Sequence, residues 1–142
     1  TTPYYAFVDA GYNVDIVSIN GGAVPIDPRS KNPAGENPPS VERFLTDQTA
    51  MQKIEQTQAV TAVDLSHYVA VFLPGGHGTM WDLPKSDALA NLIGAAMDDG
   101  KIVAAVCHGP AGLVNAKLKN GDSVVKGKKV SAFTNEEEEA MG

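Results

Sequence analysis

The sequence is poor in cysteine, because Cys107 is the single cysteine among its 142 residues. A chain with one cysteine cannot form an internal disulfide, which excludes the small disulfide-stabilised secreted folds and favours a reducing compartment. No apolar run approaches the roughly 20 residues that a helix needs to span a bilayer, and no signal peptide is visible. The sequence therefore predicts a cytoplasmic protein that does not contact a membrane.

Positive charge is also scarce. The chain has 11 lysines and arginines against 17 aspartates and glutamates, which gives a formal net charge of −6. This balance argues against a partner with a phosphate backbone, so no nucleic acid is expected. The hydrophobic content of 43% and the length are ordinary for a soluble globular protein. We therefore expect one domain over residues 1–142.

What the chain does have is a cysteine at a sharp turn. Residues 102–106 form an apolar run of the kind found in a parallel strand covered on both faces. Gly109 and Pro110 end that strand, and Pro110 suits the first position of a helix. Cys107 then lies between a strand and a helix N-terminus, as in a nucleophile elbow. Because such a position favours a thiolate, we predict a reactive cysteine rather than a small buried hydrophobe.

A glycine run follows the other buried strand, which we expect at residues 68–73. The run, residues 74–78, has no Lys-Ser/Thr at the offset of a phosphate-binding loop. Gly75 and Gly76 can present bare backbone N–H groups, which predicts an oxyanion hole; a plain tight turn is the alternative. His77 is a candidate to line the same site. With one cysteine and three histidines, no metal-ligand cluster is visible, so neither a metal nor another cofactor is expected.

The remaining pattern predicts an α/β fold. Helices are expected at residues 2–10, 87–98, 111–116 and from about 134, and short strands at 14–18, 123–126 and 129–133. The proline-rich stretch 20–40 is either a lid or a surface excursion. Thr134 with Glu137, or Asn135 with Glu138, has capping-box spacing, which predicts a mainly solvated acidic first turn. Because a parallel sheet builds from strand-helix-strand units, we expect a strand missing before residue 1, and a C-terminal segment missing after residue 142 as well.

Together these motifs resemble the ThiJ/PfpI superfamily, which has the class I glutamine amidotransferase-like fold. The resemblance is carried by AAVCHGP at residues 104–110, PGGHG at 74–78 continuing through 84, and FTNEEE at 133–138. The segments at 3–15 and 25–30 resemble its heat-shock glyoxalase III branch, also called D-lactate dehydratase. The resemblance implies a three-layer sandwich with a mainly parallel, flavodoxin-like sheet.

The resemblance also implies roles for individual residues. Cys107 matches the family nucleophile, His108 the histidine beside it, and Glu138 the acidic residue that orients this histidine. Gly75 and Gly76, with the backbone N–H of His108, match the oxyanion hole. The family has one further glutamate, which hydrogen-bonds the cysteine. By its spacing this glutamate would fall immediately before Thr1.

The function implied by the resemblance is a glutathione-independent conversion of methylglyoxal, a 2-oxoaldehyde, to D-lactate. A deglycase or stress-protective role would use the same thiol, and a homodimer is a further expectation. Two alternatives remain open. A cysteine peptidase or amidase would need an open cleft. A holding chaperone or oxidation sensor without turnover would expose an apolar patch, and its function would survive the loss of Cys107.

Overall fold

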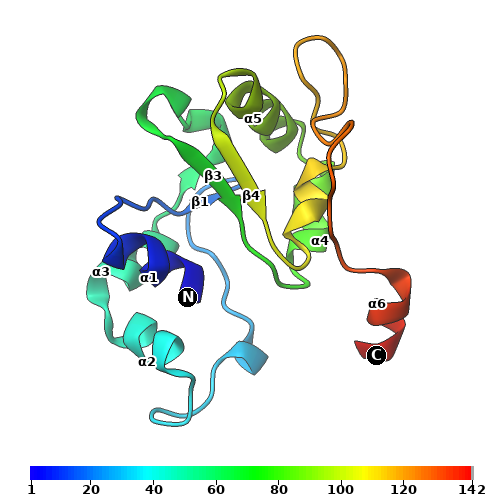
Figure 1. Ribbon diagram of the computed structural model, residues 1–142. Helices are drawn as coiled ribbons and strands as arrows, with labels where there is room; N and C mark the ends of the chain where they lie inside the picture. Colours follow the sequence, from blue (N-terminus) through cyan, green and yellow to red (C-terminus); the bar gives the residue numbers. More distant parts are fainter. Residues whose placement is uncertain (142) are drawn as a thin grey trace. The chain divides into compact units, whose positions relative to one another are not determined.

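The computed structural model describes residues 1–141, and the chain divides into two compact units, one over residues 1–59 and one that begins at residue 60. Figure 1 shows the chain coloured along its sequence. The α-helices are α1 (Thr2–Asp9), α2 (Pro39–Thr46), α3 (Gln48–Glu55), α4 (Thr79–Asp82), α5 (Asp87–Asp98) and α6 (Asn135–Met141). The strands are β1 (Val17–Ser18), β2 (Gln58–Ala59), β3 (Ala70–Leu73) and β4 (Ile102–Ala105). Short 3₁₀ helices complete the list: η1 (Pro28–Ser30), η2 (Val60–Ala62), η3 (Leu65–His67), η4 (Leu83–Lys85) and η5 (Gly109–Leu113).

The first unit is built on an aromatic cluster. Tyr5 and Phe44 are buried with Ala50, and Tyr4 packs edge-on against both rings. The Tyr5 hydroxyl donates to Asp47 at 3.0 Å. Burial, followed by the hydrogen bond to Asp47, raises the pKa of Tyr5 to about 12. The aromatic cluster thus holds α1, α2 and α3 together, while β1 and β2 pair in parallel.

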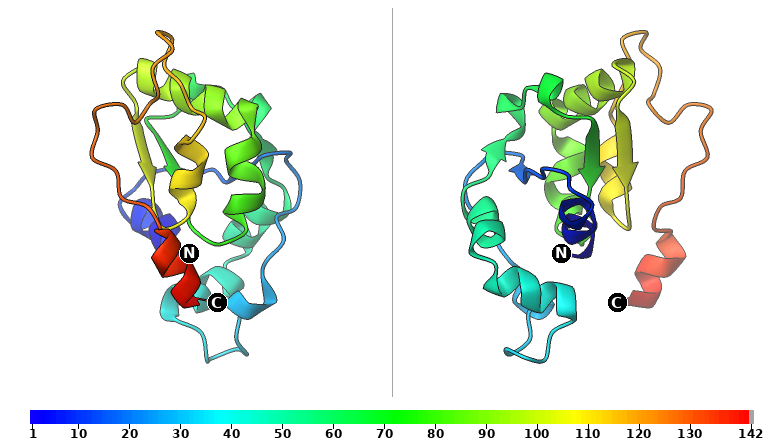
Figure 2. Two further views of the ribbon diagram at one scale, coloured as in Figure 1. Left: turned by 90° about the vertical axis from the view of Figure 1, so that its right-hand side faces the viewer. Right: turned by 60° about the vertical axis from the view of Figure 1, so that its left-hand side comes forward.

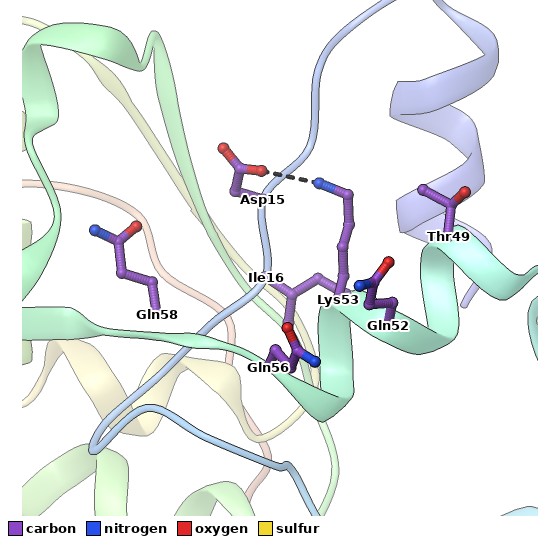
Figure 3. Close-up of a pocket in the computed structure, with 7 residues that line it drawn as sticks. All are labelled: Asp15, Ile16, Thr49, Gln52, Lys53, Gln56 and Gln58. Carbon is purple, nitrogen blue, oxygen red and sulfur yellow. Dashed lines mark hydrogen bonds and ion pairs between the residues drawn. The ribbon is translucent and has the colours of Figure 1, made fainter.

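A polar hollow of about 360 Å³ also belongs to this unit (Figure 3). Its lining residues are Asp15, Ile16, Thr49, Gln52, Lys53, Gln56 and Gln58. Lys53 and Asp15 form an ion pair at 2.9 Å in it, so the two charges of the hollow compensate each other. Most of the predicted strand 14–18 is irregular, and β1 keeps only its last two residues.

The second unit contains the parallel pair β3 and β4, with Ala70 opposite Ile102 and Leu73 opposite Ala105. Both views in Figure 2 show these strands running in the same direction. Because side chains alternate between the faces of a strand, Leu73 points toward the core, where it meets Leu89 of α5 at Gly112. Ile102, on the other face, is 66% exposed. The expectation that both faces are covered is therefore wrong for the described residues, since Ile102 and Ala104 share this exposed face of β4.

Two local predictions of secondary structure were also wrong. Residues 123–133 form turns and an extended segment instead of two strands, and their one pairing is an isolated bridge from Ser123 to Lys117. After Cys107 the chain forms the five-residue 3₁₀ helix η5 instead of an α-helix over 111–116. By contrast, α5 spans the predicted residues, and Ser86 caps it by accepting a hydrogen bond from the backbone N–H of Leu89 at 3.1 Å.

The segment after η5 carries α6 back to the carboxyl ends of β3 and β4. In Figure 1 this segment is orange and α6 is red. Thr134 caps α6 reciprocally with Glu137: the Thr134 backbone N–H donates to the Glu137 carboxylate at 2.8 Å, and Glu137 N–H donates to the Thr134 hydroxyl at 3.2 Å. The 134–137 pair is thus the capping box, which leaves Glu138 free for another contact.

Candidate active site

Cys107 stands at the turn directly after β4 and lies in neither a helix nor a strand. Its φ of +58° makes it the one residue other than glycine, among those described, with a left-handed backbone. This conformation costs about 1–2 kcal/mol for a residue with a side chain. The turn leaves the thiol exposed, as a nucleophile elbow does.

The glycine run approaches this turn so closely that it leaves no room for a side chain. A Cβ atom on Gly75 would lie 2.5 Å from the Cβ and 3.1 Å from the Sγ of Cys107. A Cβ atom on Gly109 would lie 2.4 Å from the carbonyl oxygen of Leu73. Gly76 has a φ of +108°. Glycine is therefore required at Gly75 and Gly109 by contact and at Gly76 by backbone conformation.

His108 links the thiol to Glu138. Its Nδ1 lies 3.2 Å from Sγ of Cys107, and its Nε2 is hydrogen-bonded to Oε1 of Glu138. The imidazole is buried, with a side chain 2% exposed, whereas that of Glu138 is 40% exposed. Glu138 is the least exposed of the four consecutive glutamates, although it is only partly buried. The expected contact between Glu138 and His108 is present.

These contacts favour a thiolate beside a protonated imidazole. The hydrogen bond from His108 is the main cause that lowers the pKa of Cys107, and the backbone N–H groups of Gly76 and His108 lower it further. Glu138 and then Cys107 raise the pKa of His108. In the imidazolium both ring N–H groups donate, one to the thiolate and one to the carboxylate. Because η5 is a short 3₁₀ helix, the histidine and not a helix dipole is the main stabilising group.

Two further rings surround His108. Phe133 stacks on it with ring centroids 4.4 Å apart and planes inclined by 24°. The His77 ring lies 4.3 Å away, and its Nε2 is 3.5 Å from Oε2 of Glu138. His77 was expected near the site, whereas no role was expected for Phe133. The signal for Phe133 was its position just before the capping box, at the start of α6.

The structure thus brings all six predicted residues into the second unit around one thiol: Cys107, His108, Glu138, Gly75, Gly76 and His77. It also groups ligand atoms of His77, His108 and Glu138 within 4.8 Å of one another. This cluster was not visible in the sequence, from which no metal site was expected. Among the described residues, no helix is both long and apolar enough to cross a membrane.

The lowered pKa predicts the pH dependence of alkylation. A thiolate forms above its own pKa, so the rate with iodoacetamide should rise with a midpoint below about 8.5, the value of a free thiol. In His108→Asn the midpoint should move up toward the free value, because the donor to Sγ is lost. Rates measured by mass spectrometry from pH 5 to 10 check this. Equal midpoints in the two proteins would mean that His108 does not stabilise the thiolate.

Known proteins resemble this chain over most of its length. Residues 1–140 match the DJ-1/PfpI family. Glutathione-independent glyoxalase hsp3102 of Schizosaccharomyces pombe is 34% identical over 99% of this chain and 60% of its own length. Protein/nucleic acid deglycase HchA of Pseudomonas aeruginosa is 29% identical over 92% of this chain and 46% of its own. The chain thus spans about 60% or less of the length of these relatives.

Solved structures show the same fold. The glyoxalase III structure from Candida albicans is 30% identical and superposes with a TM-score of 0.86, covering 99% of this chain and 59% of that one. The Francisella tularensis Rapid Encystment Protein is 37% identical, with a TM-score of 0.88 and coverage of 100% and 62%. These matches confirm the predicted flavodoxin-like α/β fold class. The chain belongs to the DJ-1/PfpI family.

Proposed function

We propose that this chain carries the active site of a glutathione-independent glyoxalase, which converts methylglyoxal or a similar 2-oxoaldehyde to D-lactate. The observation that supports this best is the continuous series of contacts from the exposed Cys107 thiol through His108 to Glu138. A 2-oxoaldehyde is a strong electrophile that an activated thiol attacks directly. The glyoxalases among the relatives support the same reaction.

The first step is addition of the Cys107 thiolate to the aldehyde carbon. A carbon–sulfur bond forms, and the carbonyl electron pair moves to oxygen, giving a hemithioacetal. The backbone N–H groups of Gly75, Gly76 and His108 are the proposed donors to this oxyanion. Gly76 and His108 already direct their N–H groups toward the sulfur, so the site holds donors next to the reacting atom.

The second step moves a proton from C1 to C2. The His108 imidazolium first gives its Nδ1 proton to the hemithioacetal oxyanion and becomes neutral. The neutral imidazole, held by Glu138, then takes the C1 proton and returns it to C2 of the enediol, while the C1 hydroxyl proton passes to the oxygen on C2 and C1 becomes a thioester carbonyl. Water then attacks the thioester, the carbon–sulfur bond breaks, and D-lactate leaves with the thiol regenerated. The sum is methylglyoxal plus water to lactate, so no external oxidant or reductant takes part. The lyase class, a cytoplasmic location and a homodimer remain predictions.

Deglycation is the second candidate. Cys107 is exposed, which favours access by adducts on larger molecules, and a relative of this chain is the deglycase HchA. An aminocarbinol adduct carries the same C1 and C2 atoms as methylglyoxal, so the same thiol would form a carbon–sulfur bond at C1 while the carbon–nitrogen bond breaks and the protonated amine leaves. Parallel assays with free methylglyoxal and with freshly glycated N-acetyl-lysine separate the two functions.

The proposed function is tested by D-lactate production from methylglyoxal without glutathione. Glu138→Gln should lower kcat about 100-fold or more, because the amide neither raises the pKa of His108 nor holds its proton during transfer. Glu136→Gln and Glu139→Gln are matched controls from the same helix turns and should keep the parent kcat. Equal losses of kcat in the three variants would mean that Glu138 has no special role and that the four glutamates only form a solvated first turn of the helix. Absence of D-lactate with the parent protein would refute the glyoxalase function.

A further inference from the structure

The proposed reaction uses His108 and Glu138 but gives no role to His77, which completes a cluster of three metal-ligating side chains with them. The three residues come from three separate segments: the loop after β3, the turn after β4, and helix α6. Nε2 of His77 lies 3.5 Å from Oε2 of Glu138, and Nε2 of His108 is bonded to Oε1. Each histidine therefore points its Nε2 at the Glu138 carboxylate, and each faces a different carboxylate oxygen.

Two imidazoles and one carboxylate are the protein ligands of a well-known class of zinc site, which keeps its fourth position open. Zinc bonds of about 2.0–2.2 Å in a tetrahedral site place the ligand atoms roughly 3.3–3.6 Å apart. The ligand atoms here already lie within 4.8 Å of one another. The hydrogen-bonded atoms of His108 and Glu138 must separate slightly to admit an ion, whereas Nε2 of His77 already lies 3.5 Å from Oε2 of Glu138. The side chains of His77 and Glu138, 51% and 40% exposed, have room to make this adjustment.

The same exposure gives an ion a path to the cluster, since only His108 is buried. The Cys107 thiol contacts Nδ1 of His108, on the opposite side of the ring from Nε2. A metal bound to Nε2 therefore does not require Cys107 as a ligand. A metal at this position would replace the proton on Nε2 and take over the carboxylate of Glu138. His108 would then lose the partner that holds it for proton transfer.

We propose that His77, His108 and Glu138 form an inhibitory site for a zinc-type divalent cation, which stops the active site reversibly by taking Glu138 and Nε2 of His108 from catalysis. The inhibitory part rests on the proposed function, whereas the binding part does not. Cys107 remains free in the metal-bound state. Zinc bound at this site therefore differs from zinc captured by the thiol.

The test is zinc binding to the purified protein without substrate, measured by competition with a chromophoric chelator. We expect one Zn²⁺ per chain, with an affinity reduced at least about 10-fold in His77→Gln, because even an outer partner of a metal ligand is worth 10–100-fold. His67→Gln is the matched control. His67 is also exposed and lies 3.8 Å from a carboxylate, that of Asp64, but it does not belong to the cluster of three ligands. Its affinity should equal the parent's.

Two further measurements separate this site from its competitors. Zinc-saturated protein should still be alkylated at Cys107, and Cys107→Ser should bind zinc as the parent does. Blocked alkylation, or binding lost in Cys107→Ser but kept in His77→Gln, would overturn the proposal in favour of a zinc thiolate. Zinc should also inhibit turnover, with full recovery in EDTA and a half-inhibiting concentration at least about 10-fold higher in His77→Gln. If the parent binds zinc but does not turn over methylglyoxal, the proposed glyoxalase function is wrong, whereas the proposal of a metal site stands.

Discussion

Replacing Cys107 by serine is expected to abolish 2-oxoaldehyde consumption, with a loss of about 1,000-fold or more in kcat/KM, as for nucleophile deletions in other enzymes. His108 lowers the pKa of the Cys107 thiol, which can therefore ionise near neutral pH. A serine hydroxyl is far less acidic and stays protonated there. The fold should persist, because the thiol is exposed and serine differs from it by one atom. D-lactate formation, with circular dichroism as the check on folding, measures the effect.

A second substitution at the same residue separates the chemistry from the backbone. Cys107→Gly should be equally inactive but should melt at a higher temperature than Cys107→Ser, because glycine accepts a φ of +58° without the left-handed penalty. Turnover by Cys107→Ser at the parent rate would remove Cys107 as nucleophile and bring the chaperone hypothesis forward. A lower melting temperature for Cys107→Gly would argue against the elbow conformation.

Gly75→Ala is expected to have the second largest effect. The new methyl group would lie 2.5 Å from the Cβ of Cys107, which no side-chain rotation can relieve, because both Cβ atoms are fixed by the backbone. Either β3 and β4 separate at their ends or the elbow moves. Since a misplacement of about 1 Å can cost about 100-fold in rate, turnover should fall by at least that factor, together with the melting temperature.

Gly78→Ala is the matched control for this prediction. Gly78 lies in the same loop, has nothing within 4 Å of the position of a new Cβ, and has a φ of −53° that any residue adopts. Its melting temperature should stay equal or rise slightly, because alanine at a compatible position reduces the entropy of the unfolded chain. If Gly75→Ala and Gly78→Ala have equal turnover and equal melting temperatures, the close approach of Gly75 to Cys107 is contradicted. Alkylation of Cys107 gives an independent reading of the elbow in each.

The sequence by itself determined the features that depend on local spacing. Helix α5 spans residues 87–98 as its apolar periodicity predicts, and Ser86 caps it. The Thr134–Glu137 capping box and the cysteine at a turn after a strand also follow from neighbours a few residues apart. The family motifs added the expected roles of the residues at that turn, because they mark short segments whose backbone geometry the chemistry requires.

Only the tertiary structure decided which distant residues meet. Among four consecutive glutamates, Glu138 is distinguished by its contact with His108, which lies 30 residues earlier in the chain. Phe133 and His77 joined the same histidine, and together the two histidines and Glu138 made a metal-ligand set that no spacing in the sequence suggests. Residues 123–133, with their strand-like composition, form no strand in the described part of the chain, because a strand needs a partner and composition does not supply one. Contacts between segments far apart in the chain depend on where the packed elements carry them, and local propensity contains no information about that.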